Sequence, residues 1–473
     1  MTDIRELDRQ YIFHPFSVLN AHEQAGAAMM ARSAEGVWIT DDRGKRYLDA
    51  MAGLWCVNVG YGRGEIADAL ANQARKLSYF HGFSSMATEP AALLAERVIT
   101  KAPAGMSKAF FGASGSDAND TQAKLVWYYN NVLGRPEKKK IIARERGYHG
   151  VTVMSGGLTG LSSLHDGFDL PLPMVRHVSA PHNLWVRHAG ETDAAFADRL
   201  ARELEDTILA EGPETVAAFI AEPVMGAGGV IVPPEGYFAK IQAVLDRHDV
   251  LLIADEVICG FGRLGTWFGS EKLGLRPDLM TVAKGITSGY APLSACLVGE
   301  KVWQVISSEK AAKYGAFGHG YTYTAHPVMA AAGLANLDLM ESEGLIERAG
   351  RMGAVLQEQL RDTFRDFPIA AETRGDGLMA AVEFAKPSAD GWQRFDPKLT
   401  VGPKIARAAL DAGLIVRALP LCDAISMSPP FVITEDQIAF TASTLRRAAA
   451  TVLETLNSDG VLSDEQSEYQ NVG

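Results

Sequence analysis

Three short segments carry residue types that could do chemistry together, and the first is a small-residue loop at 112–120, GASGSDAND. Small residues let the backbone approach a ligand closely, and free N–H groups at the start of a helix attract an anion. The spacing matches neither GxGxxG nor a P-loop, because no Lys-Ser/Thr pair follows. The segment therefore indicates a phosphate cradle, or else a plain turn in which Ser116 or Asp117 caps the next helix.

The second segment, 253–265, reads IADEVICGFGRLG and places two adjacent carboxylates, Asp255 and Glu256, at the end of an apolar strand. Ligands of open α/β sheets bind outside the carboxyl ends of the strands. A buried carboxylate is costly unless it is hydrogen-bonded or paired with a cation. The pair favours a binding site, although either residue could instead cap a loop or pair with Arg263.

The third segment, 281–295, reads TVAKGITSGYAPLSA and places Lys284 between an apolar strand and a glycine-rich turn. A lysine in a pocket loses hydration, its pKa falls, and its free amine becomes a nucleophile for carbonyls. A solvated surface lysine is the alternative. Together the three segments supply what pyridoxal phosphate requires: a cradle for its phosphate, an acid facing its ring nitrogen and a lysine for its aldehyde.

The elements that must position these segments alternate between strands and helices. Short apolar runs separated by amphipathic stretches predict strands buried on both faces, as in a mostly parallel α/β sheet. The expected strands cover 108–113, 139–144, 216–222, 250–256, 279–284 and 294–299, and the expected helices 116–133, 194–212 and 236–249. After residue 327 we expect helices at 327–341, 345–366 and 435–457, and strands at 379–384 and 414–419.

This change of pattern predicts a large α/β domain at residues 61–325. A smaller α+β domain is expected from both chain ends, residues 1–60 and 326–460. Residues 461–473 are expected to be a poorly ordered tail.

The composition excludes several classes of protein. Of 473 residues, 47% are hydrophobic and 22% charged, as in ordinary globular proteins and unlike disordered or fibrous ones. The net charge of −12 is a poor match for nucleic acid or an anionic membrane. No apolar run reaches the roughly 18 residues of a membrane-spanning helix, and residues 1–16 resemble neither a secretion signal nor a transit peptide. Four separated cysteines favour a reducing cytoplasm over disulfides or structural zinc.

The histidines at 14, 149 and 319 invite a metal interpretation. Their spacings fit no metal-ligand pattern such as HExxH. We therefore expect hydrogen-bonded or surface histidines and no bound metal.

Over about residues 15–450 the chain resembles the class III aminotransferases of the fold-type I pyridoxal-phosphate superfamily. The resemblance rests on the order and spacing of SGSDAND, ERGYHG, AEPVMGAGG, IADEVICGFGRLG, AKGITSGYAPLSA, GHGYTYTAHP and GLIVRA. Within the class, the chain is most similar to ω-amine:pyruvate transaminases. The resemblance implies pyridoxal 5′-phosphate as cofactor, a mostly parallel seven-stranded sheet in the large domain, and a homodimer.

The family pattern also implies roles around the cofactor ring. Lys284 resembles the lysine that forms a Schiff base with the cofactor and later moves a proton, and Asp255 resembles the partner of the ring nitrogen. Val257 would pack on one face of the ring and Tyr148 would stack on the other. A core aromatic is the alternative for Tyr148.

The phosphate ligands implied by the resemblance are Ser114, Gly115 and Ser116. Thr322 matches a further phosphate ligand that the neighbouring subunit delivers, so that the site would be complete only in a dimer. A hydroxyl on a strand is the alternative for Thr322.

Two positions bear on the substrate. Class III enzymes such as 4-aminobutyrate transaminases carry an arginine after the Tyr/Phe-His-Gly motif, which binds a distal carboxylate, and here that position is Val151. They also carry a glutamate before the Gly-Gly pair, and here that position is Ala227. Both replacements remove charge from the pocket and favour apolar amines over dicarboxylates.

The pocket walls are expected to include aromatic side chains. Arg417 in GLIVRA matches a mobile arginine that binds the α-carboxylate of a keto acid such as pyruvate, with a structural arginine as the alternative. Trp55 and Phe83 match pocket-wall aromatics, although ordinary core packing would explain them as well. Met86 and Ile258 would add to the walls.

The sequence therefore predicts transamination from an amine without an α-carboxylate to pyruvate, which yields a ketone or aldehyde and alanine. Alternatives within the class are a β-alanine or taurine:pyruvate aminotransferase, a 4-aminobutyrate transaminase and an aminomutase. From other classes, a non-catalytic cofactor- or amine-binding protein and a nucleotide-binding dehydrogenase were considered, and the glycine spacing disfavours the dehydrogenase.

Overall fold

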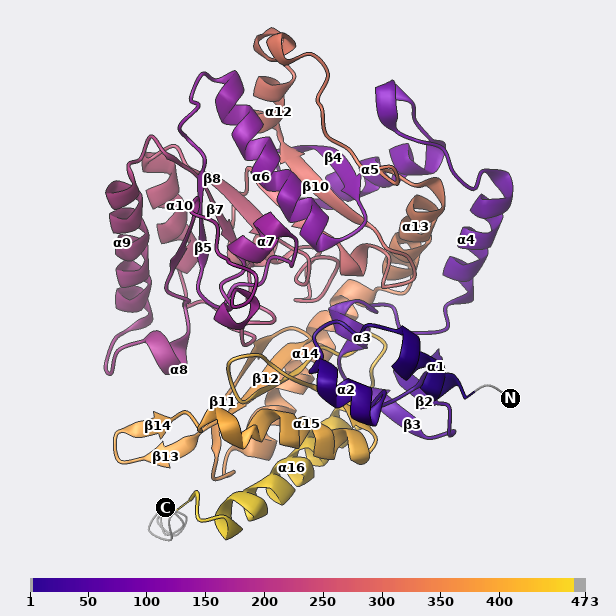
Figure 1. Cartoon of the computed structure of the whole chain (residues 1–473), viewed down its shortest axis with the longest axis vertical. Helices are drawn as coiled ribbons and strands as arrows, with labels where there is room; N and C mark the ends of the chain where they lie inside the picture. Colours follow the sequence, from indigo (N-terminus) through magenta and orange to yellow (C-terminus); the bar gives the residue numbers. More distant parts are fainter. Residues whose placement is uncertain (1–2, 463–473) are drawn as a thin grey trace.

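The computed structural model describes residues 3–462, which form sixteen α-helices, seventeen strands and a few short 3-10 turns. Figure 1 shows an α/β body with a smaller part below it, to which segments from both ends of the chain contribute. None of the helices in the described part combines the length and hydropathy needed to cross a bilayer.

A seven-stranded sheet forms the centre of the body, in the order β4-β10-β9-β8-β7-β5-β6. All neighbouring strands are parallel except β10, which is antiparallel to both β4 and β9. The bounds are β4 Met106–Gly112, β5 Lys140–Arg144, β6 Val175–Val178, β7 Val216–Ala221, β8 Leu251–Asp255, β9 Leu279–Val282 and β10 Ser294–Gly299. The mostly parallel α/β sheet expected from the apolar runs is thus confirmed.

Helices cover both faces of this sheet, because its strands are apolar on both sides. On β8, Leu252 packs into one hydrophobic cluster, whereas Leu251 and Ile253 point the other way into a second. The first cluster includes side chains of α5 Glu89–Lys101, α9 Asp193–Glu211, α10 Tyr237–Arg247 and α13 Pro327–Ser342. The second includes side chains of α6 Gly115–Val132, α7 Val153–Leu158 and α12 Glu300–Ile306.

The smaller part contains three further sheets. One is ordered β1-β2-β3-β15, another β11-β12-β17-β16, and β13 pairs with β14 as a hairpin. The bounds are β1 Ala31–Glu35, β2 Trp38–Asp41, β3 Arg46–Asp49, β11 Ala370–Asp376, β12 Met379–Phe384, β13 Lys386–Ser388, β14 Gly391–Gln393, β15 Leu414–Ile415, β16 Arg417–Ala418 and β17 Ala424–Met427. Since β15 pairs in parallel with β3, the two ends of the chain share one sheet.

The single strand expected at 414–419 is wrong. Residues 414–415 pair with β3, whereas 417–418 pair with β17 in a different sheet. The chain therefore passes from one sheet edge to another at Val416, and an apolar run gives no sign of such a transfer. One result is that Arg417 lies in a strand of only two residues.

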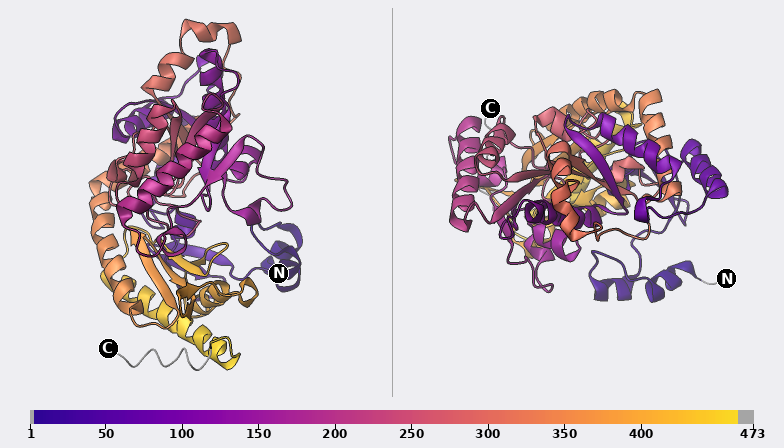
Figure 2. Two further views of the ribbon diagram at one scale, coloured as in Figure 1. Left: turned by 90° about the vertical axis from the view of Figure 1, so that its left-hand side faces the viewer. Right: turned by 90° about the horizontal axis from the view of Figure 1, so that it is seen from above.

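The remaining helices are α1 Ile4–Tyr11, α2 Leu19–Ala25, α3 Ala52–Trp55, α4 Gly64–Lys76, α8 Asn183–Val186, α11 Gly269–Leu273, α14 Leu345–Phe364, α15 Val401–Asp411 and α16 Glu435–Ser458. In the right-hand view of Figure 2, α1 and α2 stand off from the body as an arm. The domain boundaries at residues 60, 325 and 460 stay predictions, and residues 463–473 of the expected tail lie outside the described residues.

Candidate active site

A cavity of about 440 Å³ lies at the carboxyl ends of β4, β8 and β9, where ligands of open α/β sheets bind. All three segments singled out in the sequence reach it. Its lining includes Ser114, Gly115, Ser116, Tyr148, Asp255, Val257, Ile258 and Lys284. The fold thus brings together residues that lie up to 170 positions apart in the sequence.

The start of α6 forms one wall of this cavity. Ser114 caps the helix, because its Oγ accepts a hydrogen bond from the Asp117 N–H and the Asp117 carboxylate accepts one from the Ser114 N–H. The cap is therefore Ser114, not Ser116 or Asp117. A Cβ on Gly115 would lie 3.0 Å from a Val257 methyl group, so glycine lets the loop approach closely. Among residues 3–462, the backbone N–H groups of Gly115 and Ser116 have no acceptor, which leaves them free for an anion.

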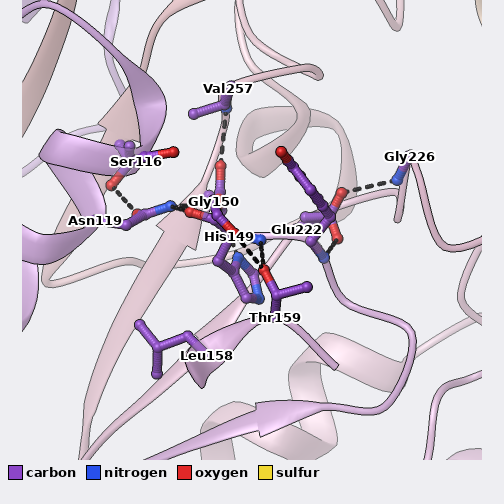
Figure 3. A network of polar contacts seen from close by, with 12 residues as sticks. Ser116, Asn119, His149, Gly150, Leu158, Thr159, Glu222, Gly226 and Val257 are labelled. Atoms are coloured by element: carbon purple, nitrogen blue, oxygen red, sulfur yellow. Dashed lines mark hydrogen bonds and ion pairs between the residues drawn. The ribbon is translucent and has the colours of Figure 1, made fainter. Parts of the chain in front are cut away.

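Asp255 ends β8 and is held by three donors. Its Oδ2 accepts hydrogen bonds from His149 Nδ1 at 2.8 Å and Asn119 Nδ2 at 2.9 Å, and its Oδ1 accepts one from the Val257 N–H at 3.1 Å. Figure 3 shows Asn119, His149 and Val257 in this network. Asn119 is itself fixed by Thr281 Oγ1 at 2.8 Å. These three donors fix the direction of the carboxylate.

Glu256 points away from the cavity. It accepts hydrogen bonds from the N–H groups of Gly269 and Ser270 at the start of α11, and burial raises its pKa to about 7. Adjacent side chains of a strand point to opposite faces, which explains why the two carboxylates separate. Glu256 thus caps the start of α11, whereas Asp255 faces the cavity and also accepts a hydrogen bond from the Val257 N–H of the following loop. The pairing with Arg263 is wrong, since Arg263 donates to Asn58 and to two backbone carbonyls.

Lys284 follows β9 and lies in the wall of the cavity. Its backbone φ is 44°, in the left-handed region that long side chains rarely adopt, and such strain is typical of functional sites. Burial lowers the pKa of its amine, although Cys56, Asp255 and Glu222 act in the opposite direction. Its Nζ forms no hydrogen bond or ion pair with any other described residue. A solvated surface lysine is therefore excluded.

Four residues of the site were missed at the sequence level: Cys56, Asn119, His149 and Glu222. Glu222 lies at the end of β7, and its carboxylate accepts hydrogen bonds from the Tyr148 N–H at 3.0 Å and the Gly226 N–H at 2.8 Å. Burial raises the pKa of Glu222 and also that of Tyr148. The strand-end rule that identified Asp255 applies equally to Glu222 and could have identified it.

A second cavity, of about 610 Å³, adjoins the first at Tyr148, which lines both. Ala227 and Arg417 lie in its wall. The Arg417 guanidinium stacks over Trp55, 5.4 Å from the ring centroid, and it makes no hydrogen bond or ion pair within residues 3–462. Trp55 itself is 3% exposed and packs in one cluster with Ala227 and Ile258.

Phe83, Met86 and Thr322 lie elsewhere and line neither cavity. Phe83 is 48% exposed and Met86 51% exposed. The Thr322 carbonyl accepts a hydrogen bond from the Tyr79 hydroxyl at 2.7 Å, in the same exposed region. Within one chain these residues therefore do not contribute to the site.

The histidines at 149 and 319 are hydrogen-bonded, His149 to Asp255 and His319 to Thr121 and Lys124. His14 contacts Asp8 and His22, and the ligand atoms of these three residues lie within 4.8 Å of one another. The expectation that no metal binds stays a prediction.

The residues of the first cavity fit pyridoxal phosphate. The free N–H groups of Gly115 and Ser116 suit a phosphate, the fixed Asp255 carboxylate suits a protonated ring nitrogen, and the unpaired Lys284 amine suits an aldehyde. Val257 and Tyr148 supply the walls between which a flat ring would lie.

Comparisons with known proteins agree with this geometry. The family model "Aminotransferase class-III" matches residues 19–449. Diaminobutyrate–2-oxoglutarate transaminase of Halomonas elongata is 47% identical over 97% of this chain and 98% of its own length, and gamma aminobutyrate transaminase 3 of Solanum lycopersicum is 46% identical over 92% and 83%. The ω-transaminase of Pseudomonas jessenii, solved in complex with PMP, has a TM-score of 0.92 and 44% identity over 96% and 99% of the two chains.

Proposed function

The chain belongs to the class III aminotransferases, which depend on pyridoxal 5′-phosphate, and we propose that it transfers the amino group of an amine lacking an α-carboxylate to pyruvate. The products are a ketone or aldehyde and alanine. One observation carries this proposal: the Arg417 guanidinium lies in the wall of the second cavity beside Tyr148 and Ala227, stacked over Trp55 and with no ion pair among residues 3–462. The uncharged neighbours accept an apolar substrate, and Arg417 offers a charged group for the carboxylate of pyruvate.

The chain's own residues would hold the cofactor at its phosphate and at its ring nitrogen. The N–H groups at the start of α6 bind the phosphate, and Ser114 and Ser116 flank it. Asp255, held by His149 and Asn119, would face the ring nitrogen and would stabilise its protonated form. When bound, the cofactor carries the amino group between substrates and disperses the negative charge that develops at the reacting carbon.

Lys284 moves the proton. Its amine, whose pKa is lowered by burial, is unprotonated in a larger fraction of molecules than a surface lysine at the same pH. Nζ can therefore take a proton from the substrate carbon that bears the amino group and later return it. The cavity around Nζ has Cys56, Tyr148 and Ile258 in its wall, which limits access of water to the reacting atoms.

Arg417 binds the carboxylate of pyruvate through two parallel hydrogen bonds. When an apolar amine occupies the same space, the guanidinium must move aside. Because it is held only by stacking on Trp55, with no ion pair within the described residues to break, this movement is inexpensive.

We also propose that a second copy of the chain completes the site. Phe83 and Thr322 match residues of the family's site, yet both lie on an exposed surface that also carries Tyr79, Phe80 and Tyr323. An exposed aromatic patch of this kind suits contact with another subunit. Sedimentation analysis should give a dimer, and Thr322→Ala should weaken cofactor retention. The cytoplasmic location stays a prediction.

The second candidate is a transaminase for 4-aminobutyrate or diaminobutyrate, favoured by the identities of 46–47% with enzymes of those names. The uncharged side chains of Val151 and Ala227 argue against tight binding of the donor's carboxylate, and the Val151 side chain is 57% exposed.

A donor panel with pyruvate as acceptor tests the proposal. We expect a simple arylalkylamine to bleach the yellow holoenzyme and to yield alanine at a higher kcat/KM than 4-aminobutyrate, β-alanine or taurine. Faster alanine formation from 4-aminobutyrate would support the second candidate instead. Faster alanine formation from β-alanine or taurine would support an aminotransferase for that donor. No spectral change with any amine would refute transamination.

A further inference from the structure

The second cavity contains another arginine beyond Arg417. Arg394 follows the β13–β14 hairpin and lines the same cavity of about 610 Å³. Figure 1 shows this hairpin below α8, the helix that carries Trp185. Arg394 and Arg417 thus line the same cavity, and Tyr148 lines both this cavity and the cofactor cavity.

The position of the Arg394 guanidinium is fixed, but most of its donors are unused. It stacks over the Trp185 ring, 4.3 Å from the centroid. Its Nη1 lies 3.4 Å from the Leu421 carbonyl oxygen and 3.8 Å from Glu383 Oε1. Its Nε and Nη2 donate no hydrogen bond to any residue from 3 to 462. The side chain is 42% exposed, so these donors face the cavity or solvent.

Glu383 does not neutralise Arg394, because that carboxylate already has closer partners. Arg374 Nη2 lies 2.6 Å from its Oε2, and the Trp185 indole donates to its Oε1 at 2.6 Å. The other carboxylate in the wall, Asp423, accepts a hydrogen bond from the Gly402 N–H at the start of α15. Two arginines and two carboxylates thus line the cavity, but neither carboxylate forms a hydrogen bond with Arg394.

We propose that Arg394 binds the distal carboxylate of a dicarboxylic 2-oxo acid, such as 2-oxoglutarate, while Arg417 binds its α-carboxylate. The inference rests on the proposed transamination and widens its acceptors beyond pyruvate. A planar guanidinium with free parallel donors is the group best suited to a carboxylate.

Arg394→Met tests the proposal, since methionine keeps much of the stacked apolar length and removes the charge. The acceptors are 2-oxoglutarate, pyruvate and 2-oxopentanoate, the last of which has the chain length of 2-oxoglutarate without the distal carboxylate. With one amine donor and holoenzyme, kcat/KM for 2-oxoglutarate should fall about tenfold or more, whereas the values for the other two should stay within about twofold.

Two further variants serve as comparisons. Arg394→Lys keeps the charge without the planar fork and should fall between the wild type and Arg394→Met. Arg407→Met removes an exposed arginine of α15 that pairs with Asp411 and lines neither cavity, and it should change nothing.

Inhibition supplies a readout that needs no turnover of the dicarboxylate. Against pyruvate, glutarate should inhibit the wild type more strongly than butyrate, and Arg394→Met should abolish this difference.

Wild-type enzyme that uses pyruvate but not 2-oxoglutarate would overturn the inference, as would equal losses on all three acceptors in Arg394→Met. If no 2-oxo acid is accepted, the proposed function fails instead, so the two failures are distinguishable.

Discussion

The two cavities differ in how many of their charged groups already have partners. At the cofactor end, the Asp255 carboxylate accepts three hydrogen bonds from the protein. At the substrate end, the Arg417 guanidinium donates to no carboxylate within the described chain, and the Trp55 Nε1 is buried without an acceptor. The cofactor end is therefore organised before any ligand arrives, whereas the substrate end obtains its partner from the substrate.

This difference has an energetic basis. A buried carboxylate costs several kcal/mol unless donors surround it, and the donors at Asp255 come from rigid elements, α6 and the residues after β5. An arginine that must serve both an apolar amine and a carboxylate cannot be fixed in that way. We expect changes at the cofactor end to affect all substrates alike, and changes at the substrate end to affect selectivity.

The largest effect is expected for Lys284→Ala, which removes the group that holds and moves the proton. Turnover with every donor should fall by roughly four orders of magnitude, because general acid–base and covalent roles are lost together. Bound cofactor should still be visible in the absorbance spectrum. Lys76→Ala, at an exposed lysine paired with Glu89, is the control. Normal amination of pyruvate by Lys284→Ala would contradict the assigned role.

Asp255→Asn should have the next largest effect. The amide presents a donor where His149 and Asn119 already donate, and it no longer stabilises a protonated ring nitrogen. Rates of both half-reactions, measured by stopped-flow absorbance, should fall about 100-fold by the same factor for amines and for alanine. A loss confined to one substrate class would place Asp255 at the substrate end and would contradict the proposed difference between the two cavities.

Arg417→Met should separate the substrates. The half-reaction with pyruvate should slow about 30-fold, because a charge-assisted pair is lost, and the half-reaction with an arylalkylamine should change by less than about threefold. Single-turnover kinetics measure both. Equal losses would mean that Arg417 supports the fold and does not recognise a carboxylate.

The smallest effect concerns stability, at Glu256, which faces away from both cavities. Burial raises the pKa of this carboxyl from 4.5 to about 7. Between pH 4.5 and pH 7 the Glu256 carboxyl is ionised in the unfolded chain but keeps its proton in the folded chain. The free energy of unfolding therefore falls as pH rises. Through this group the free energy of unfolding of the wild type should fall by about 2 kcal/mol, and Glu256→Gln should not show this decrease.

Denaturant unfolding of both proteins at pH 5 and pH 8 checks this. Glutamine also loses one acceptor for the N–H groups of α11, which lowers stability equally at both pH values, so only the difference between them is diagnostic. Identical pH dependence in the two proteins would refute the raised pKa.

The large sheet could be predicted because its strands are buried on both faces and read as short apolar runs. The same reasoning placed Asp255 and Lys284 at strand ends, since a polar residue after an apolar strand is a local signal. The split at Val416 had no such signal, because residues 414–419 form a short β-prone run that no turn residue interrupts at the transfer between sheets.

Contacts between segments that lie far apart in the sequence could not be predicted either. His149 and Asn119 matter because they meet at Asp255, 106 and 136 residues away, which only the fold reveals. Arg394 follows a short hairpin that carries no motif, and its importance depends on the Trp185 ring beneath it. Neither the contacts at Asp255 nor the stacking of Arg394 on Trp185 can be predicted from the sequence alone.

The central claim is that one lysine of the cofactor cavity binds pyridoxal phosphate. Reduction of the yellow holoenzyme with borohydride, followed by peptide mass spectrometry, tests it directly. We expect a pyridoxyl group on Lys284 and on no other lysine. A pyridoxyl group on a different lysine, or none on a protein that retains the cofactor, would contradict it.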